Sequence, residues 1–177
     1  MSPEPLFQIH LVFGYVTAML LFRIYLWPRL KALTAIDAQR AIAMLHSFRF
    51  FGLVFILPGV VGPDLPGRFA TFAAYGDLAT GVLAMAAVLT SKRGRLFWWF
   101  VVAFNVVGAV DIVVDYVQAI LGDLPAHAGQ LGSMYAIPIL YVPLLMITHV
   151  AAAYLRSGAT KPSGGQRAAR ALLYRRV

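Results

Sequence analysis

The sequence predicts an all-α integral membrane protein, built as a bundle of five transmembrane helices. Of the 177 residues, 60% are hydrophobic and only 12% are charged, whereas a soluble domain is about half apolar and about a quarter charged. The apolar residues gather in five stretches, each of roughly the 20 residues that a helix needs to cross a bilayer. Basic residues fall in alternate connections between these stretches, as expected when successive connections lie on opposite sides of a membrane.

The five spans follow one another along the chain. An open strand cannot satisfy its backbone hydrogen bonds in hydrocarbon, so each span is expected to be a helix. The predicted spans cover residues 6–27, 41–61, 69–89, 97–121 and 134–156. Together they form one five-helix transmembrane domain over residues 1–156. A linker rich in Gly and Ser opens the remaining segment, 157–177, which is expected to be a flexible basic cytoplasmic tail.

The connection between the first two spans, residues 28–40, is too polar to cross the membrane. Pro28 ends the first helix or opens the next one. Thr34 with Asp37 three residues later is a carboxylate variant of the capping box, so we expect a short interfacial helix that runs into the second span. Small residues on the third span, among them Gly76, predict that this helix packs centrally.

The basic residues orient the bundle. They follow the first span (Arg29, Lys31, Arg40), the third span (Lys92, Arg93, Arg95) and the fifth span, whereas the other connections and the N-terminal segment hold only Arg68. The positive-inside rule then places the N-terminus outside and the C-terminus in the cytoplasm. The content of Ala, Gly, Val and Arg favours a bacterial inner (cytoplasmic) membrane. In such a protein a net charge of +8 indicates contact with anionic membrane lipids and not with nucleic acid.

The fourth predicted span carries polar residues at positions where exposure to lipid would be unfavourable. A charged side chain at the membrane centre costs at least ~2.5 kcal/mol. Spacings of three and four residues place Asn105, Gly108, Asp111, Ile112 and Asp115 along one helical stripe. We therefore expect this stripe to face other helices or water enclosed between them.

Other spans carry ionisable residues at comparable depths. Counted from the inner ends of their spans, His46 and His149 lie at one level; counted from the outer ends, Asp77 and Asp111 lie at another. Arg49 lies one turn beyond His46 and extends far enough to reach Asp77 or Asp111. The acids outnumber this one central arginine, so carboxylates are left over that can take part in proton movement.

The fifth span adds two phenols and two prolines. Tyr135, Pro138, Tyr141 and Pro143 fall in the sequence MYAIPILYVP. Each proline removes a backbone hydrogen bond and frees a carbonyl in the preceding turn. A kinked helix with free carbonyls and phenols can line a pocket, although proline also bends membrane helices that have no such role.

The leading hypothesis is a polytopic membrane protein with a buried Asp, Arg and His cavity that binds or translocates a small ligand, with proton coupling. The residues assigned to this site are Asp77, Asp111, Asp115, Arg49, His46, His149, Asn105, Tyr135 and Tyr141. Five spans in one chain hold no inverted repeat of equal halves, so alternating access would require a homodimer.

Three alternatives remain open. His46 and His149 can be the axial ligands of a b-type haem; no other metal site is assigned, and the absence of Cys leaves no thiolate ligand. Asp and His can act as acid and base in a small membrane enzyme for a lipid or sterol-like substrate, but no H-E-x-x-H, G-x-S-x-G or phosphate loop decides whether this is an enzyme. In a non-catalytic subunit of a membrane complex, the same polar groups would contact a partner helix.

Overall fold

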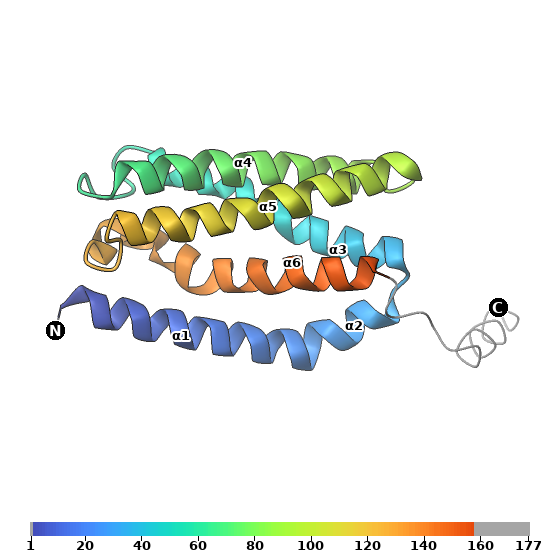
Figure 1. The fold of residues 1–177 in the computed structure, drawn as a ribbon, viewed down its shortest axis with the longest axis horizontal. Helices are drawn as coiled ribbons and strands as arrows, with labels where there is room; N and C mark the ends of the chain where they lie inside the picture. The colour runs from blue at the N-terminus through green and yellow to red at the C-terminus, as the bar shows by residue number, and fades with distance from the viewer. Residues whose placement is uncertain (1, 158–177) are drawn as a thin grey trace, which may run out of the picture.

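The computed structural model describes residues 2–157, which form an elongated helical bundle without a named β-strand. The chain runs five times between the two ends of the bundle (Figure 1). The passes are α1 (Pro3–Leu21) with the π-helical turn η1 (Phe22–Leu26) and α2 (Trp27–Ala32); α3 (Ala35–Ser47) with the 3₁₀ segment η2 (Phe48–Ile56); α4 (Gly67–Leu89); α5 (Arg95–Leu121); and η3 (Ala128–Tyr135), η4 (Ile137–Tyr141) and α6 (Val142–Arg156). The predicted tail, 157–177, lies almost entirely outside the described residues.

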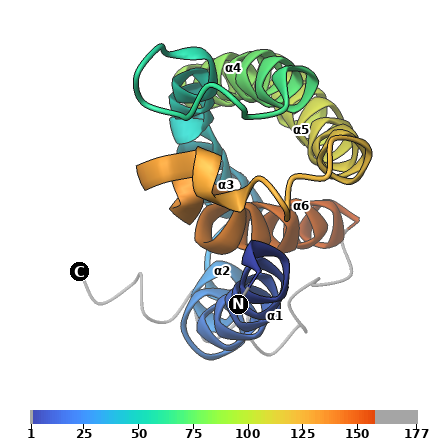
Figure 2. The ribbon, with the colours of Figure 1, turned by 90° about the vertical axis from the view of Figure 1, so that its left-hand side faces the viewer.

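The helices surround a common interior. Seen from one end, α3, α4, α5 and α6 form a ring, and α1 lies outside it against α6 (Figure 2). The contacts agree with this view, because α4 packs on α3, η2 and α5, whereas α1 packs on η4 and α6. The small-residue face of α4 is central, as predicted: Ala73, Ala74 and Ala84 are each at most 2% exposed.

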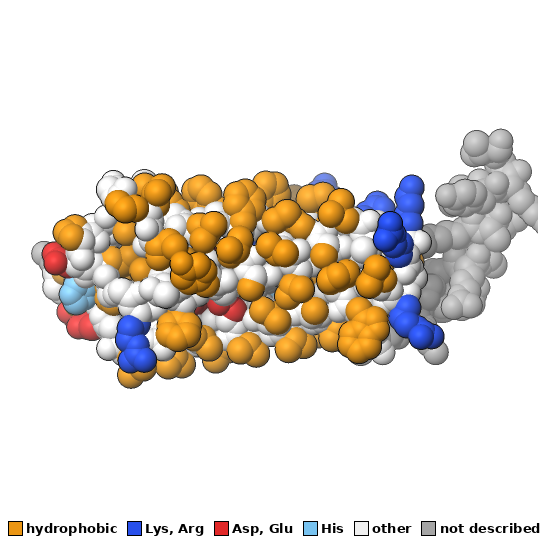
Figure 3. Space-filling view, turned by 90° about the horizontal axis from the view of Figure 1, so that it is seen from above, with side chains coloured by type: hydrophobic (Ala, Val, Ile, Leu, Met, Phe, Trp, Pro, Cys, Tyr) orange, Lys and Arg blue, Asp and Glu red, His pale blue; other side chains and the backbone are white. Residues whose placement is uncertain are grey.

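The all-helical prediction is confirmed for the described residues, and four of the helices are long and apolar enough to cross a membrane. These are Pro3–Ala32, Gly67–Leu89, Arg95–Leu121 and Ile137–Arg156. They correspond to the first, third, fourth and fifth predicted spans. Large apolar side chains cover the side of the molecule that Figure 3 shows. Among the apolar residues of the whole described surface, Phe13, Val110 and Trp99 are each more than half exposed.

The second predicted span, 41–61, is not one α-helix. The α-helix ends at Ser47 and continues as the 3₁₀ segment η2, after which Leu57 is extended. The buried residues of η2 are Arg49, Gly52 and Phe55. They recur every three residues, and a 3₁₀ helix has three residues per turn, so this conformation brings all three onto one face.

The connection before α3 also differs from the expectation. Pro28 lies inside the first pass, which continues through η1 to Ala32, so the predicted interfacial helix is divided between two elements. The predicted cap at Thr34 is confirmed: its side-chain oxygen accepts a hydrogen bond from the backbone N–H of Asp37 at 3.1 Å. Helix α3 therefore begins where the sequence signal places a helix start.

Helix α1 docks through a close backbone approach. Gly14 is buried, and a Cβ atom at this position would overlap the carbonyl oxygen of Ile139 in η4. Pro143 has no N–H with which to bond the carbonyl four residues earlier, that of Ile139. Gly14 thus lets α1 pack against the part of the fifth pass that its prolines distort.

Replacing Gly14 with Leu is expected to separate α1 from η4 and to lower the melting temperature of the purified protein. Overpacking of this kind typically costs about 1–3 kcal/mol. Val16→Leu, at a position of α1 that is 50% exposed, is the matched control and should leave the melting temperature unchanged. Equal melting temperatures for Gly14→Leu and the wild type would contradict the close packing.

Candidate functional site

A layer of polar side chains divides the apolar core into two clusters. One cluster includes Ile42, Ala84 and Phe104, and the other includes Phe55 and Phe69. On the second, third and fourth passes, the polar residues lie between the members of the two clusters along the sequence, and on the fifth pass Thr148 and His149 directly follow Ile147 of the first cluster. The buried ones are Arg49, His46, Asp77, Thr80, Asp111, Thr148 and His149, none more than 8% exposed.

Arg49 is the centre of this layer and is 1% exposed. Its Nε donates to Oδ1 of Asp77 at 2.5 Å, and its Nη2 donates to Oδ2 of Asp111. Its Nη1 donates to the carbonyl oxygen of Gly108 at 3.2 Å and to Nε2 of His149 at 3.4 Å. Four of the five N–H donors of the guanidinium are therefore used, and they connect η2 to α4, α5 and α6.

The two ion pairs of Arg49 show which of the three acids in the bundle has a cationic partner and which has none. The sequence allows Arg49 to reach Asp77 or Asp111, and the structure places it against both. A planar guanidinium can serve two carboxylates because its donors point in fixed and different directions. Of the three acids on the predicted stripe and on α4, only Asp115 is left without a cationic partner.

Glycines on the neighbouring helices make room for these side chains. A Cβ atom on Gly52 or Gly76 would overlap the carboxylate of Asp77 or Asp111, respectively. A Cβ atom on Gly108 would lie 2.6 Å from Nε2 of His149. At these glycines the backbone packs directly against the carboxylates and the imidazole. The close packing restricts the positions of these side chains.

The hydrogen bonds assign the tautomer of His149. Arginine can only donate, so Nε2 of His149 is the acceptor and the ring proton is on Nδ1. That nitrogen lies 3.0 Å from Oδ1 of Asn105, whose Nδ2 in turn donates to the carbonyl of Val101 at 2.8 Å. Asn105 therefore orients the imidazole that orients Arg49.

His46 lies beside His149, with ring centroids 4.1 Å apart. Its Nε2 is 3.0 Å from Oγ1 of Thr148, which donates its own proton to the carbonyl of Leu144 or Leu145. Nε2 of His46 is then the donor, and its Nδ1 is a buried acceptor without a partner among the described residues.

This arrangement does not fit a haem held between the two histidines. Axial ligands bind the iron from opposite faces of the macrocycle, so a porphyrin would have to lie between the rings. Here the rings lie directly side by side, with centroids 4.1 Å apart and planes inclined at 46°, and each Nε2 already has a hydrogen-bond partner. Within residues 2–157, no group of three His, Asp or Glu side chains is arranged to hold a metal ion.

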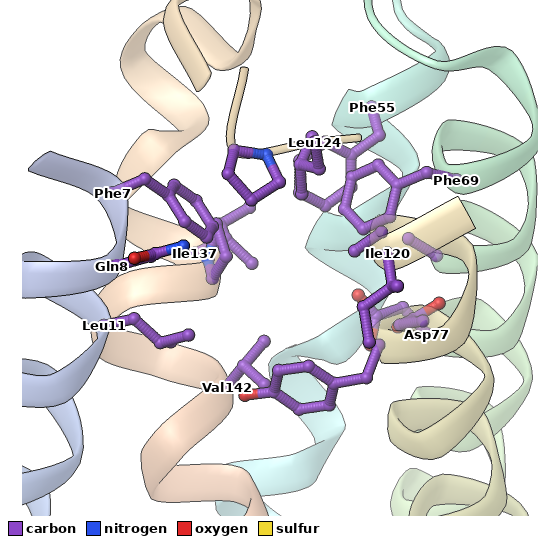
Figure 4. Close-up of a pocket in the computed structure, with 16 residues that line it drawn as sticks. Phe7, Gln8, Leu11, Phe55, Phe69, Asp77, Ile120, Leu124, Ile137 and Val142 are labelled. Carbon is purple, nitrogen blue, oxygen red and sulfur yellow. The ribbon is translucent and has the colours of Figure 1, made fainter. Parts of the chain in front are cut away.

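A cavity of about 240 Å³ lies next to the polar layer, on the side of the N-terminal end of α1. Its walls come from α1, η2, α4, α5, η4, α6 and the turn after α5, and most of its lining is apolar (Figure 4). Among the sixteen residues that line it, the only ionisable ones besides Tyr116 are Asp77 and Asp115. Asp77 thus has one oxygen on Arg49 and also borders the cavity.

Asp115 is the distinctive group in this wall. Its Oδ1 is buried and has no hydrogen-bond partner among the described residues. Next to it, the hydroxyl of Tyr116 is 2.7 Å from that of Tyr15 on α1, so this phenol is already paired. A buried oxygen without a partner is rare in folded proteins, and Asp115 is one of the two acids in the wall of the cavity.

The remaining predicted site residues lie farther from Arg49 in the hydrogen-bond network. The hydroxyl of Tyr141 donates to the carbonyl of Leu45 at 2.8 Å. The hydroxyl of Tyr135 pairs with Nδ1 of His10 at 2.9 Å, and within the described residues neither tyrosine is hydrogen-bonded to a side chain of the Arg49 network. Both phenols connect the fifth pass to neighbouring passes.

Sequence reasoning missed three contributors: Thr148, Gly52 and the carbonyl of Gly108. Thr148 precedes His149 directly, but a lone threonine in an apolar helix carries no signal of its own. The three-residue spacing of Arg49, Gly52 and Phe55 was a usable signal for the 3₁₀ face. The role of the Gly108 carbonyl depends on which helix lies opposite, and the sequence contains no such information.

Fold and site together define a helical bundle of membrane-span dimensions with a buried arginine–carboxylate–histidine network. Residues 6–155 match the model of a family described as a domain of unknown function, DUF8737. The chain belongs to this family, and the match covers all five passes. No match was found among curated proteins or among solved structures.

Removing the cation at the centre of the network should strongly destabilise the fold. In Arg49→Met, Asp77 and Asp111 lose their shared partner, and loss of one member of a buried ion pair costs about 3–5 kcal/mol. Thermal or denaturant unfolding of the purified protein measures the change. Adding Asp77→Asn and Asp111→Asn to Arg49→Met should recover part of the loss.

The matched control is Arg40→Met, which breaks the exposed pair of Arg40 with Asp37. Exposed pairs contribute about 0–1 kcal/mol, so this variant should behave as the wild type. If Arg49→Met were no less stable than Arg40→Met, the network would not be a principal stabilising element.

Proposed function

We propose that the chain is an integral membrane protein with five membrane passes, the N-terminus outside and the C-terminus in the cytoplasm. The second pass is the one not covered by a long α-helix. Its 13 α-helical residues rise ~1.5 Å each and its nine 3₁₀ residues ~2.0 Å each. In line they reach about 37 Å, more than the ~30 Å hydrocarbon core of a bilayer.

The distribution of charge supports the proposed orientation. Lys and Arg gather at one end of the molecule, whereas Asp, Glu and His lie at the other with a single basic group (Figure 3). The first end holds the connection between α4 and α5 with Lys92, and the second holds Asp64 and Asp123. By the positive-inside rule the first end is cytoplasmic, and a bacterial inner membrane is the proposed location.

The absence of Cys from the sequence permits a direct test of this topology. Single-cysteine variants Asp64→Cys and Lys92→Cys place one exposed thiol at each end of the molecule. In intact cells a membrane-impermeant maleimide should label Asp64→Cys, and it should label Lys92→Cys only after permeabilisation. Equal labelling of both in intact cells, or the reverse pattern, would contradict the proposal.

We further propose that the protein binds a small, mostly apolar ligand in the cavity between α1, α5 and η4. The observation that carries this proposal is the cavity of about 240 Å³ with Asp77 and Asp115 in its wall. Ligand sites are concave and mainly apolar, with few polar groups that fix orientation, and typically measure ~300–1,000 Å³. A cavity slightly below this range suits a small ligand.

Ligand occupancy would be transmitted through Asp77. One oxygen of Asp77 bonds Arg49 while its side chain borders the cavity. A ligand that displaces this carboxylate would also move Arg49, and with it Asp111 and His149. This connection supports coupling of binding to helix positions and to the protons of the polar layer, as a proton-coupled carrier or sensor requires.

A filled cavity should abolish binding. In Ala119→Phe, a ring at a lining position of α5 occupies the space of the cavity. Phenethylamine, phenethyl alcohol and phenylacetate form a series of probes of similar size and different charge. At least one should raise the melting temperature of the wild type, because a ligand that binds only the folded state stabilises it.

None of these probes should shift the melting temperature of Ala119→Phe. Val117→Phe adds the same ring to the outer face of α5, where Val117 is 46% exposed, and should keep the response. The cavity would not be a binding site if no probe stabilised the wild type, or if Ala119→Phe responded equally.

A further inference from the structure

We infer that the ligand of this cavity is a small lipophilic cation, an amine or alkylammonium whose charge pairs with Asp115 and whose body lies among the aromatic side chains. The inference rests on the proposed binding function and adds the chemical class of the ligand.

The charge around the cavity favours a cation. Asp115 lies one helical turn from Asp111 on α5 and shares the wall of the cavity with Asp77. Three carboxylates against one guanidinium leave two negative charges when all are ionised. Arg49 is already engaged by Asp77 and Asp111, so the uncompensated carboxylate is the one that faces the cavity.

The lining offers nothing to an anion. None of the sixteen residues that form the wall is Lys, Arg or His. An anionic ligand would place a further negative charge beside Asp115, at the cost of both desolvation and repulsion. A neutral apolar ligand would leave Oδ1 of Asp115 buried without a partner, which is unfavourable for a polar atom.

The aromatic side chains in the wall of the cavity also favour a cationic ligand. Phe7 lies on one side of the cavity and Phe69 on the other, beside Phe55 (Figure 4). The rings of Phe55 and Phe69 pack edge to face with centroids 5.6 Å apart. The negative face of an aromatic ring attracts a cation, and cages of such rings are a known device for binding alkylated ammonium groups.

Gln8 adds a polar group at the α1 side of the cavity. Its amide is exposed and its side chain is directed toward the space (Figure 4). The amide oxygen can accept a hydrogen bond from an ammonium. The cavity therefore has a carboxylate in the α5 wall, aromatic side walls and one neutral acceptor opposite, which together fit one positive charge on an apolar body.

The test compares phenethylamine, which is cationic at neutral pH, with phenethyl alcohol, its neutral counterpart, in binding to the purified full-length protein. The amine should bind at least about tenfold more tightly, since removing one partner of a desolvated charge pair costs well over the energy of a tenfold change. Asp115→Asn should remove this preference while it leaves binding of the alcohol unchanged.

Two controls test whether the effect of Asp115→Asn is specific to the binding site: the stability of this variant and the ligand preference of Asp64→Asn. Asp115 has no partner to lose, so Asp115→Asn should keep the melting temperature of the ligand-free protein. Asp64→Asn removes the same charge from an exposed position and should keep the preference for the amine. This control distinguishes specific pairing with Asp115 from nonspecific attraction between the amine and the negative charges of the protein.

Binding of the alcohol with no preference for the amine, or an unchanged preference in Asp115→Asn, would overturn the cationic class while leaving the cavity as a ligand site. Failure of both probes to bind the wild type would overturn the proposed function together with this inference.

Discussion

The buried guanidinium of Arg49 is the constraint on which the rest of the structure depends. A charge removed from water is strongly unfavourable unless it is paired and hydrogen-bonded. Arg49 meets this demand with Asp77, Asp111, the Gly108 carbonyl and His149, which lie on three different helices. Since each bond has a fixed direction, the positions of α4, α5, α6 and η2 are determined together.

The conformation of η2 follows from this demand. In an α-helix, residues three apart drift around the axis by about 60° per step, so Arg49, Gly52 and Phe55 would spread over part of its circumference. The 3₁₀ segment aligns all three. Arg49 then enters the polar layer, Gly52 admits the carboxylate of Asp77, and Phe55 joins the wall of the cavity. Long 3₁₀ segments inside helical passes often occur at functional hinges, and this one connects the cavity to the ion pairs.

The cavity borders the layer of polar side chains that contains the Arg49 network. Asp77 belongs to both, and Asp115 lies one helical turn from Asp111 on the cavity side. The network holds its carboxylates by pairing them, whereas Asp115 has no such partner. The paired acids therefore hold the helices together, whereas Asp115 is the acid through which we propose that a ligand is recognised.

Much of this molecule was determined by its sequence alone. The helical class follows from apolar stretches of membrane-span length, the start of α3 from the side chain of Thr34, and the polar layer from charges that lipid does not tolerate. The sequence also placed Asp111 and Asp115 on one stripe, because helical periodicity is a local property.

Only the tertiary structure decided which groups meet. Counting residues gives depth along each helix but not the rotation of one helix against another, so it could not show that Arg49 binds two acids or that the two histidine rings lie side by side. It missed η2 because the apolar stretch 41–61 has the length and composition of a membrane-spanning α-helix. The cavity likewise exists only where six helical segments and the turn after α5 fail to fill the space between them, which is a property of packing and not of any one segment.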